Sequence, residues 1–219
     1  MFSDDPQRTQ VQGYYTLVAA CLGWAGLVIQ LYLIFLGRWA DQASLLGGLV
    51  RFFSFFTVLT NTLVAVALTC ALSHRHSAGH RFFRHPVVCA GIAVSIVLVG
   101  IAYNVLLRHL WQPHGWQRVA DELLHDVLPV MFALYWWLYV PKGLLRLKHV
   151  ALWTLYPVMY FAYVLLRGDV IGDYMYPFID IGTIGYRAAF INAGGVLLGF
   201  VVIGLVVLGA DKLMVRRQA

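Results

Sequence analysis

Residues 187–209 read RAAFINAGGVLLGFVVIGLVVLG, a long apolar stretch in which Arg187 is the one charged side chain. A helix needs about 20 predominantly apolar residues to cross a hydrocarbon core of about 30 Å. This stretch meets that requirement, and five further apolar stretches precede it, at 14–37, 52–73, 87–107, 119–140 and 149–166. The sequence therefore predicts an all-α, polytopic integral membrane protein, with six transmembrane helices forming a single domain over residues 1–219.

The composition agrees with this prediction. The 219 residues are 61% hydrophobic and 12% charged, and the mean hydropathy is +0.74. These values exclude an ordinary soluble domain. The connections between the apolar stretches are short, so any chemistry must be done by the helices and their loops.

The net charge of +6 does not indicate a nucleic-acid partner, because the basic residues form no run or stripe. They lie in small groups beside the predicted spans. Positive charge concentrates on cytoplasmic loops, so the larger group predicts that both termini are cytoplasmic. That group comprises Arg8, Arg75, Arg81, Arg84, Lys142, Arg146, Lys148, Lys212, Arg216 and Arg217, and the other comprises Arg38, Arg51, Arg108, Arg118, Arg167 and Arg187.

The strongly polar side chains within the spans lie mainly in the halves that this topology places outward. Polar groups in a membrane turn toward the interior of a helix bundle, so we expect them to share a cavity. They are Gln30, Ser54, Thr57, Thr60, Asn61, Asn104, His125, Asp126 and Asn192.

Thr57 and His125 are the pair in this set that could carry out chemistry together. Each lies about one and a half helical turns inside the start of its span, so we expect a similar depth for both. A neutral imidazole can take the proton of a hydroxyl that attacks an ester carbonyl. Structural roles stay open, since a membrane threonine can bond to a carbonyl one turn earlier and a histidine can join two helices.

Other polar residues in the spans are candidates for supporting or substrate-binding roles. Amide groups of Asn61, Asn104 or Asn192 could stabilise an oxyanion. Ser54 and Thr60 extend the polar face that carries Thr57.

Two residues that follow His125 affect its surroundings. Asp126 projects about 100° away around the helix, so we expect it to pair with Arg118, Arg187 or a polar neighbour instead of clamping the imidazole. Pro129 cannot donate to the carbonyl of His125, which frees an acceptor and should kink the helix beside the imidazole.

Metal binding has weak support in this sequence. His74 and His76 have a His-x-His spacing that could bind a metal, but a solvated loop is the favoured interpretation. His125 and Asp126 have no third ligand at a typical spacing. We therefore expect no metal and no cofactor.

The connection 167–182 is the longest predicted loop, and it alternates aromatic and acidic residues. Long loops are often functional. Two interpretations are open: a lid over the outer end of the bundle, or an interfacial aromatic hairpin.

Three short segments occur in a recognisable order: Phe55-Phe56-Thr57-Val58-Leu59, then His125 with Val127-Leu128-Pro129, then Tyr176-Pro177-Phe178. In these segments and in its six-span plan the chain resembles the androgen-induced and androgen-dependent TFPI-regulating family of membrane proteins. The resemblance implies a threonine hydrolase that acts on fatty acid esters of hydroxy fatty acids. It assigns the nucleophile to Thr57 and the catalytic histidine to His125, and it marks Tyr176 as a supporting residue.

The chain departs from the animal members of that family at two places. They carry two residues between the histidine and Val-Leu-Pro, where this chain has only Asp126. They also have a second histidine at the position that Glu122 occupies in this chain. The His-Asp pair is similar to that of bacterial relatives, which implies a bacterial inner membrane protein.

Two functions from different classes follow. The first is an intramembrane lipid ester hydrolase that uses Thr57 and His125, with a lipid or fatty acid ester as substrate and membrane lipids as surroundings. The second is a non-enzymatic lipid-binding or transport protein with an outer polar cavity. Only the first needs the threonine hydroxyl. Whether Thr60 could replace Thr57 as nucleophile stays open, and the sequence carries no signal for the oligomeric state.

Overall fold

The computed structural model describes residues 6–73 and 77–216, and the regular structure there is helical, which confirms the all-α class. Short π-helical turns (η1, η3) and 3-10 turns (η2, η4) interrupt or join the α-helices. In chain order the elements are α1 (Pro6–Ala40), α2 (Leu45–Phe52), α3 (Phe56–Leu72), α4 (Ala78–Arg84), α5 (Pro86–Ala102), η1 (Tyr103–Leu107), η2 (Arg108–Leu110), α6 (Trp116–Glu122), η3 (Leu123–Val127), α7 (Leu128–Tyr139), α8 (Leu147–Trp153), α9 (Leu155–Ile171), η4 (Pro177–Ile179) and α10 (Ile181–Arg216).

Among the described residues, four helical segments are long and apolar enough to cross a membrane. They are Thr9–Ala40, Pro86–Leu110, Leu147–Ile171 and Ile181–Val215, and the bent pair α2 and α3 adds a fifth if it counts as one span. The prediction of six spans is therefore not confirmed. Residues 119–139 of the predicted span 119–140 do lie within a continuous helical run, α6–η3–α7, but the acidic residues and His125 lower the hydropathy of this run.

The predicted span 52–73 is not one straight helix. Helices α2 and α3 meet at 76°, and the chain leaves helical geometry between them. At this break the Ser54 hydroxyl donates to the carbonyl of Val50 at 2.7 Å, a local bond that competes with helix continuation. As a result Thr57 lies in the first turn of α3 and not in the interior of a long helix.

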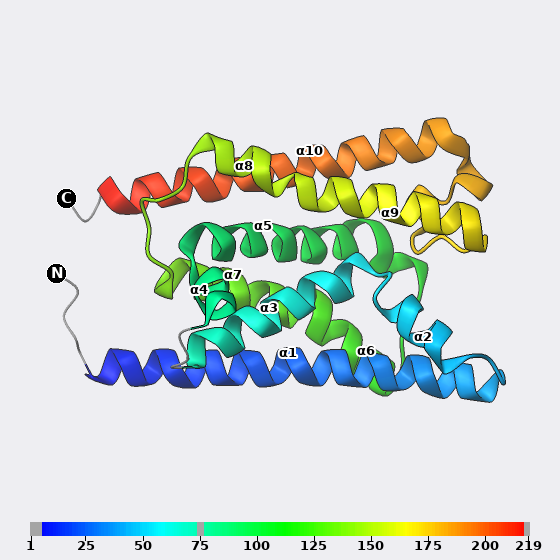
Figure 1. Cartoon of the computed structure of the whole chain (residues 1–219), viewed down its shortest axis with the longest axis horizontal. Helices are drawn as coiled ribbons and strands as arrows, with labels where there is room; N and C mark the ends of the chain where they lie inside the picture. The colour runs from blue at the N-terminus through cyan, green and yellow to red at the C-terminus, as the bar shows by residue number, and fades with distance from the viewer. Residues whose placement is uncertain (1–5, 74–76, 217–219) are drawn as a thin grey trace.

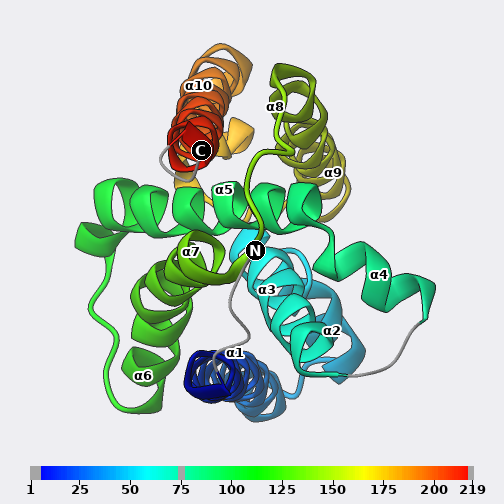
Figure 2. The same ribbon diagram turned by 90° about the vertical axis from the view of Figure 1, so that its left-hand side faces the viewer.

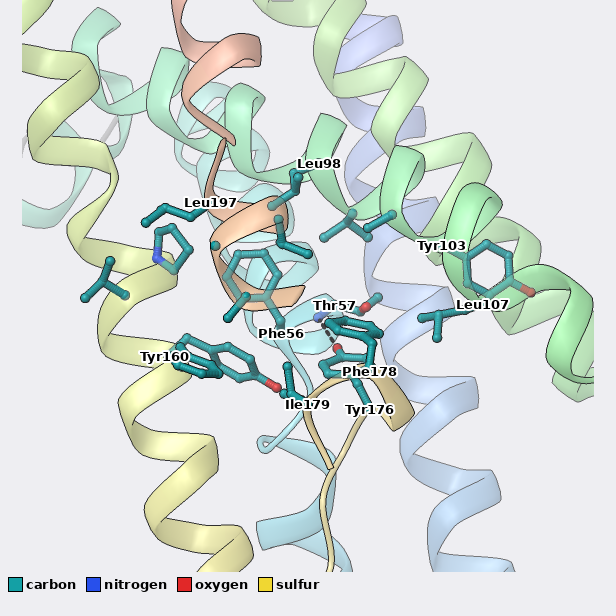
Figure 3. Close-up of a pocket in the computed structure, with 18 of the residues that line it drawn as sticks. Phe56, Thr57, Leu98, Tyr103, Leu107, Tyr160, Tyr176, Phe178, Ile179 and Leu197 are labelled. Carbon is teal, nitrogen blue, oxygen red and sulfur yellow. Dashed lines mark hydrogen bonds between the residues drawn. The ribbon is translucent and has the colours of Figure 1, made fainter. Parts of the chain in front are cut away.

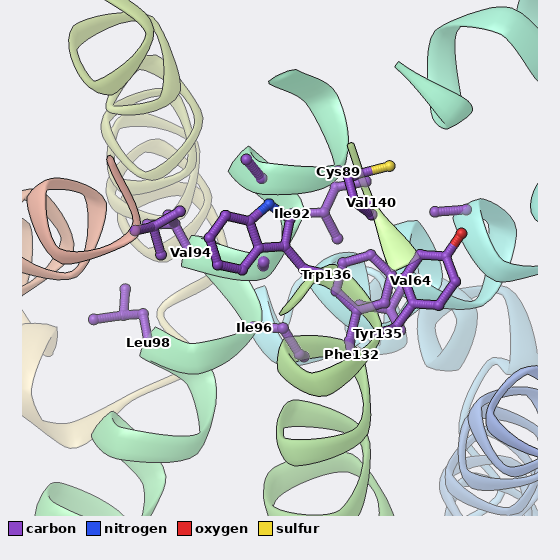
Figure 4. Close-up of a cluster of buried hydrophobic side chains, with 14 of the residues drawn as sticks. Val64, Cys89, Ile92, Val94, Ile96, Leu98, Phe132, Tyr135, Trp136 and Val140 are labelled. Atoms are coloured by element: carbon purple, nitrogen blue, oxygen red, sulfur yellow. The ribbon is translucent and has the colours of Figure 1, made fainter. Parts of the chain in front are cut away.

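Helix α5 lies between two groups of helices, with α9 and α10 on one side and α1, α3 and α7 on the other (Figures 1 and 2). The largest buried cluster joins α5 to α7 and α3 through side chains such as Ile96, Phe132, Trp136 and Val64 (Figure 4). Successive passes run in alternating directions, so α4 and the α7–α8 connection lie at the end where α1 begins and α10 ends (Figure 1). The candidate site residues lie toward the opposite end.

Gly100 lets α5 approach the helical run that carries His125. A Cβ at position 100 would lie 3.1 Å from the His125 carbonyl oxygen and 3.1 Å from the Cβ of Pro129. Such contacts are tighter than ordinary van der Waals distances, so glycine permits this approach. Pro129 cannot donate to that carbonyl, and the π-helical turn η3 ends two residues before this proline.

Candidate active site

Two π-helical turns contribute to this site, η1 at the end of α5 and η3 between α6 and α7. A π-helical turn inside an α-helix is rare and often occurs at a functional site. Tyr103 is the first residue of η1, and His125 is the central residue of η3. Their rings stack with centroids 3.9 Å apart and an interplanar angle of 20°. The two irregular turns thus bring an imidazole and a phenol into face-to-face contact.

Asp121 holds the imidazole from the preceding turn. His125 Nδ1 lies 2.9 Å from the backbone carbonyl oxygen of Asp121 and 3.3 Å from its carboxylate Oδ1. The Tyr103 hydroxyl donates to Oδ2 of the same carboxylate. Asp121 is buried, with only 3% of its surface exposed. Both neighbours of Nδ1 are acceptors, so the neutral form of this imidazole carries its proton on Nδ1 and has its lone pair on Nε2.

Thr57 lies beside a tyrosine hydroxyl at the start of α3. The first N–H groups of a helix have no partner within the helix, and Phe55 at the N-cap position has no polar side-chain atom to offer them. The N–H of Thr57 donates instead to the hydroxyl of Tyr176 in a long bond of 3.5 Å (Figure 3). Burial raises the pKa of Tyr176, and hydrogen bonds with the Thr57 side chain and backbone oppose that rise. Tyr176 therefore keeps its proton near neutral pH.

Thr57 and His125 line one cavity of about 300 Å³, which we call the histidine cavity. Its polar lining also includes Gln30, Gln117 and Asp121, and the Gln117 amide donates to the Gln30 side-chain oxygen at 2.9 Å. The remaining lining residues are Phe55, Val58, Tyr103, Leu107, Leu110, Trp111, Leu124, Met175, Tyr176 and Pro177. A candidate nucleophile and a candidate base thus face the same space.

A second cavity, of about 320 Å³, begins on the other side of Thr57, and we call it the apolar cavity (Figure 3). It extends between α5, α9 and α10, with Leu98, Pro157, Phe161 and Leu197 among its lining residues. Thr57, Tyr103, Leu107 and Tyr176 line both cavities. These four side chains lie between the histidine cavity, whose lining includes several polar side chains, and a cavity whose remaining lining is almost entirely apolar.

Ser54 and Thr60 are both buried and take part in helix contacts. The Ser54 hydroxyl lies 2.9 Å from that of Tyr163, and the Thr60 hydroxyl lies 3.1 Å from that of Tyr156. Neither residue is among those that line the two cavities. On this helix it is Thr57, together with Val58, that lines the histidine cavity.

The three candidate oxyanion donors have other partners. The buried Asn61 amide donates to the carbonyl oxygens of Thr57 at 2.9 Å and Leu124 at 3.0 Å. It therefore ties α3 to η3 and supports the position of Thr57 next to the histidine turn. The Asn104 amide donates to Gly100 and Asp126, and that of Asn192 donates to the carbonyl of Phe178.

Asp126 points away from the imidazole, as its sequence position predicts. Its carboxylate accepts from Asn104 at 2.8 Å and forms an ion pair with Arg108. Of the expected partners, the structure shows a polar neighbour, Asn104. The ion pair is with Arg108, the first residue of η2, and not with Arg118 or Arg187. Glu122 joins this group, 3.3 Å from the same guanidinium.

The connection from α9 to α10 enters the bundle. Met175 and Ile179 are buried, and Met175, Tyr176 and Pro177 line the histidine cavity. Asp173 anchors the same connection through an ion pair with Arg51 next to the α2–α3 break. Of the two interpretations of this connection, the arrangement favours a lid over an interfacial hairpin.

Asp121 and Tyr103 are the site residues that the sequence prediction missed. Asp121 precedes His125 by four residues, a spacing that places two side chains on one face of a helix. That spacing was the available signal. Tyr103 carried no such signal, since its contact with the imidazole depends on how α5 and α7 pack.

Within residues 6–73 and 77–216 there is no group of three or more His, Cys, Asp or Glu side chains that could hold a metal ion. His74 and His76, which form the His-x-His spacing, lie outside the described residues.

Comparison with protein-family models, with curated protein sequences and with solved structures gave no match for this chain. The function must therefore be argued from the geometry of the site.

Proposed function

We propose that this chain is an intramembrane hydrolase of lipid esters, with Thr57 as nucleophile and His125 as general base. One observation carries the proposal: Thr57 and His125 line the same cavity, and Thr57 also lines an apolar cavity that could hold a fatty chain. The resemblance of its three short segments to membrane threonine hydrolases supports fatty acid esters of hydroxy fatty acids as the substrate class.

The proposed reaction has two balanced steps. Nε2 of His125 takes the proton of the Thr57 hydroxyl as its oxygen bonds to the ester carbonyl carbon. The C–O bond to the alcohol then breaks, and the imidazolium returns the proton to the departing oxygen. Water attacks the acyl-threonine with His125 again as base, which releases the fatty acid and restores the hydroxyl.

Further groups in the site support this chemistry in two ways. Asp121 and the stacked Tyr103 ring hold His125 in the tautomer and orientation that a base needs. The hydroxyl of Tyr176 can donate to the oxyanion that forms next to Thr57, together with backbone N–H groups in the first turn of α3.

Membrane embedding is part of the proposal. In the most apolar window of both the α8–α9 segment and α10 only 11% of residues are buried, and apolar side chains such as Leu166 and Leu198 are exposed. So large an exposed apolar surface suits lipid better than water. We propose six passes in a bacterial inner membrane, with the ends of α1 and α10 that carry the larger basic group on the cytoplasmic side.

Cysteine accessibility tests the orientation. A cysteine at exposed Ser77 is expected to be protected from an impermeant thiol reagent in intact cells, and one at Val170, which is 84% exposed, is expected to react. Val170 suits the outer site better than Gly172, whose φ of 74° a cysteine would not adopt easily. Cys21 is exposed and should first be replaced by alanine. The reverse labelling pattern would show that the orientation is inverted.

Activity-based labelling tests the function. A fluorophosphonate with a long alkyl chain is expected to modify the purified protein at Thr57, as found by peptide mass spectrometry, and Thr57→Ala should abolish the label. Labelling that persists in Thr57→Ala, or a complete lack of labelling, would instead favour a non-catalytic lipid-binding or transport protein. That alternative shares the cavities but does not need the hydroxyl.

A further inference from the structure

The apolar cavity opens on the flank of the molecule between α9 and α10. Val158 of α9 and Phe190 of α10 both line it, and they are 45% and 55% exposed. Gly194 of α10 also lines the cavity and is exposed. A cavity whose walls reach the surface at three neighbouring positions has an opening there. In a bilayer this flank would face fatty chains and not water.

The chemistry assigns different parts of an ester to the two cavities. His125 returns its proton to the departing alcohol, so the alcohol has to leave on the histidine side of Thr57. The acyl group stays bonded to Thr57 and has to extend the other way. The residues on that other side are almost entirely apolar, and the histidine side offers Gln30, Gln117 and Asp121.

We propose that the apolar cavity is the acyl-chain site and is entered laterally between α9 and α10, and that its depth sets the chain length the protein accepts. The inference rests on the proposed hydrolase function. The substrate class is then a long-chain acyl ester whose alcohol part carries a polar group, drawn from the bilayer and not from water. Gly194 lines the exposed side of this cavity, and a Cβ built there meets no heavy atom within 4 Å, so a larger side chain has room to extend into that space.

Gly194 and Gly195 offer a matched pair of probes. Both are exposed, and an added Cβ at either meets no heavy atom within 4 Å, but Gly195 lines an adjoining cavity of about 470 Å³ whose lining does not include Thr57. Leucine has a higher helix propensity than glycine, so neither substitution is expected to impair folding of α10. The two variants differ mainly in the cavity that receives the new side chain.

The experiment compares hydrolysis of octanoyl and palmitoyl esters of one alcohol by the purified full chain in lipid nanodiscs. Gly194→Leu is expected to reduce the palmitoyl-to-octanoyl ratio of kcat/KM by about tenfold or more, because a side chain in the cavity removes space for a few methylene groups. Gly195→Leu is expected to keep the wild-type ratio. Fluorophosphonates with octyl and hexadecyl chains give the same comparison as rates of Thr57 labelling.

The outcomes separate the two proposals. An unchanged ratio in Gly194→Leu, or an equal change in both variants, overturns the acyl-chain assignment while hydrolysis through Thr57 stands. If the wild-type chain neither hydrolyses these esters nor labels at Thr57, the hydrolase function fails and the acyl-chain assignment fails with it.

Discussion

Thr57→Ala and His125→Ala are each expected to lower kcat/KM for a long-chain lipid ester by on the order of a thousandfold or more. Nucleophile and base act as one unit in this reaction, so loss of either should cost nearly as much as loss of both. The double variant is therefore expected to be no worse than the single ones within about tenfold. Hydrolysis by purified protein in nanodiscs, followed by mass spectrometry of released fatty acid, measures the effect.

Thr60→Ala is the matched control for this prediction. Thr60 is a threonine of the same helix, but it is buried and bonds to the Tyr156 hydroxyl at 3.1 Å. Its loss should reduce stability by about 1 kcal/mol and leave most of the turnover. If Thr60→Ala abolishes turnover while Thr57→Ala retains it, the nucleophile is misassigned. If neither matters, the hydrolase proposal should be abandoned in favour of a lipid-binding protein.

The helical class and the positions of the apolar segments were predictable because both depend on local composition. Apolar runs of the required length determine them almost alone. The break before α3 was not predictable in this way, since residues 52–73 read as one apolar run that begins with aromatic side chains. At the 76° bend the Ser54 hydroxyl contacts that of Tyr163 on a distant helix as well as the nearby Val50 carbonyl, and no local pattern in the sequence encodes the distant contact.

The site was partly predictable for a similar reason. An ionisable group within an apolar segment is costly, so His125 stood out from sequence alone. The roles of the asparagines could not be predicted from the sequence, because a side-chain amide bonds to whichever partner the packing brings close. Asn61 bridges Thr57 and Leu124 only because α3 contacts η3, and no local pattern in the sequence encodes that contact.

Asp121→Asn is expected to lower kcat/KM by about a hundredfold. In a serine protease the same change at the acid of the triad costs about 10⁴ in kcat, because the imidazole adopts the wrong tautomer. Here the effect should be smaller, since the backbone carbonyl of Asp121 lies 2.9 Å from Nδ1 and still accepts its proton. The carboxylate at 3.3 Å is lost, and with it the charge that stabilises the imidazolium.

Asp126→Asn is the control that distinguishes positioning from general electrostatics. It removes the same charge five residues after Asp121, from a side chain that bonds to Asn104 and Arg108 and does not line the histidine cavity. It should lower kcat/KM by no more than a few-fold. Nitrogen NMR of histidine-labelled protein measures the tautomer of His125, which would not change in Asp121→Asn if Asp121 only supported the fold. A proton on Nδ1 of His125 is expected in the wild type, and Asp121→Asn should shift the population toward Nε2.

Tyr103→Phe probes the same carboxylate from its other side. The phenyl ring keeps the stacking contact with His125 at 3.9 Å but cannot donate to Asp121 Oδ2. A loss of about tenfold in kcat/KM is expected, smaller than that of Asp121→Asn because the carboxylate remains. Equal activity losses in Asp121→Asn and Asp126→Asn, with an unchanged histidine tautomer, would show that Asp121 does not position the base. Asp121 would then be a buried residue that holds η1 against α6, and His125 would have to be oriented by its own backbone turn and by the Tyr103 ring alone.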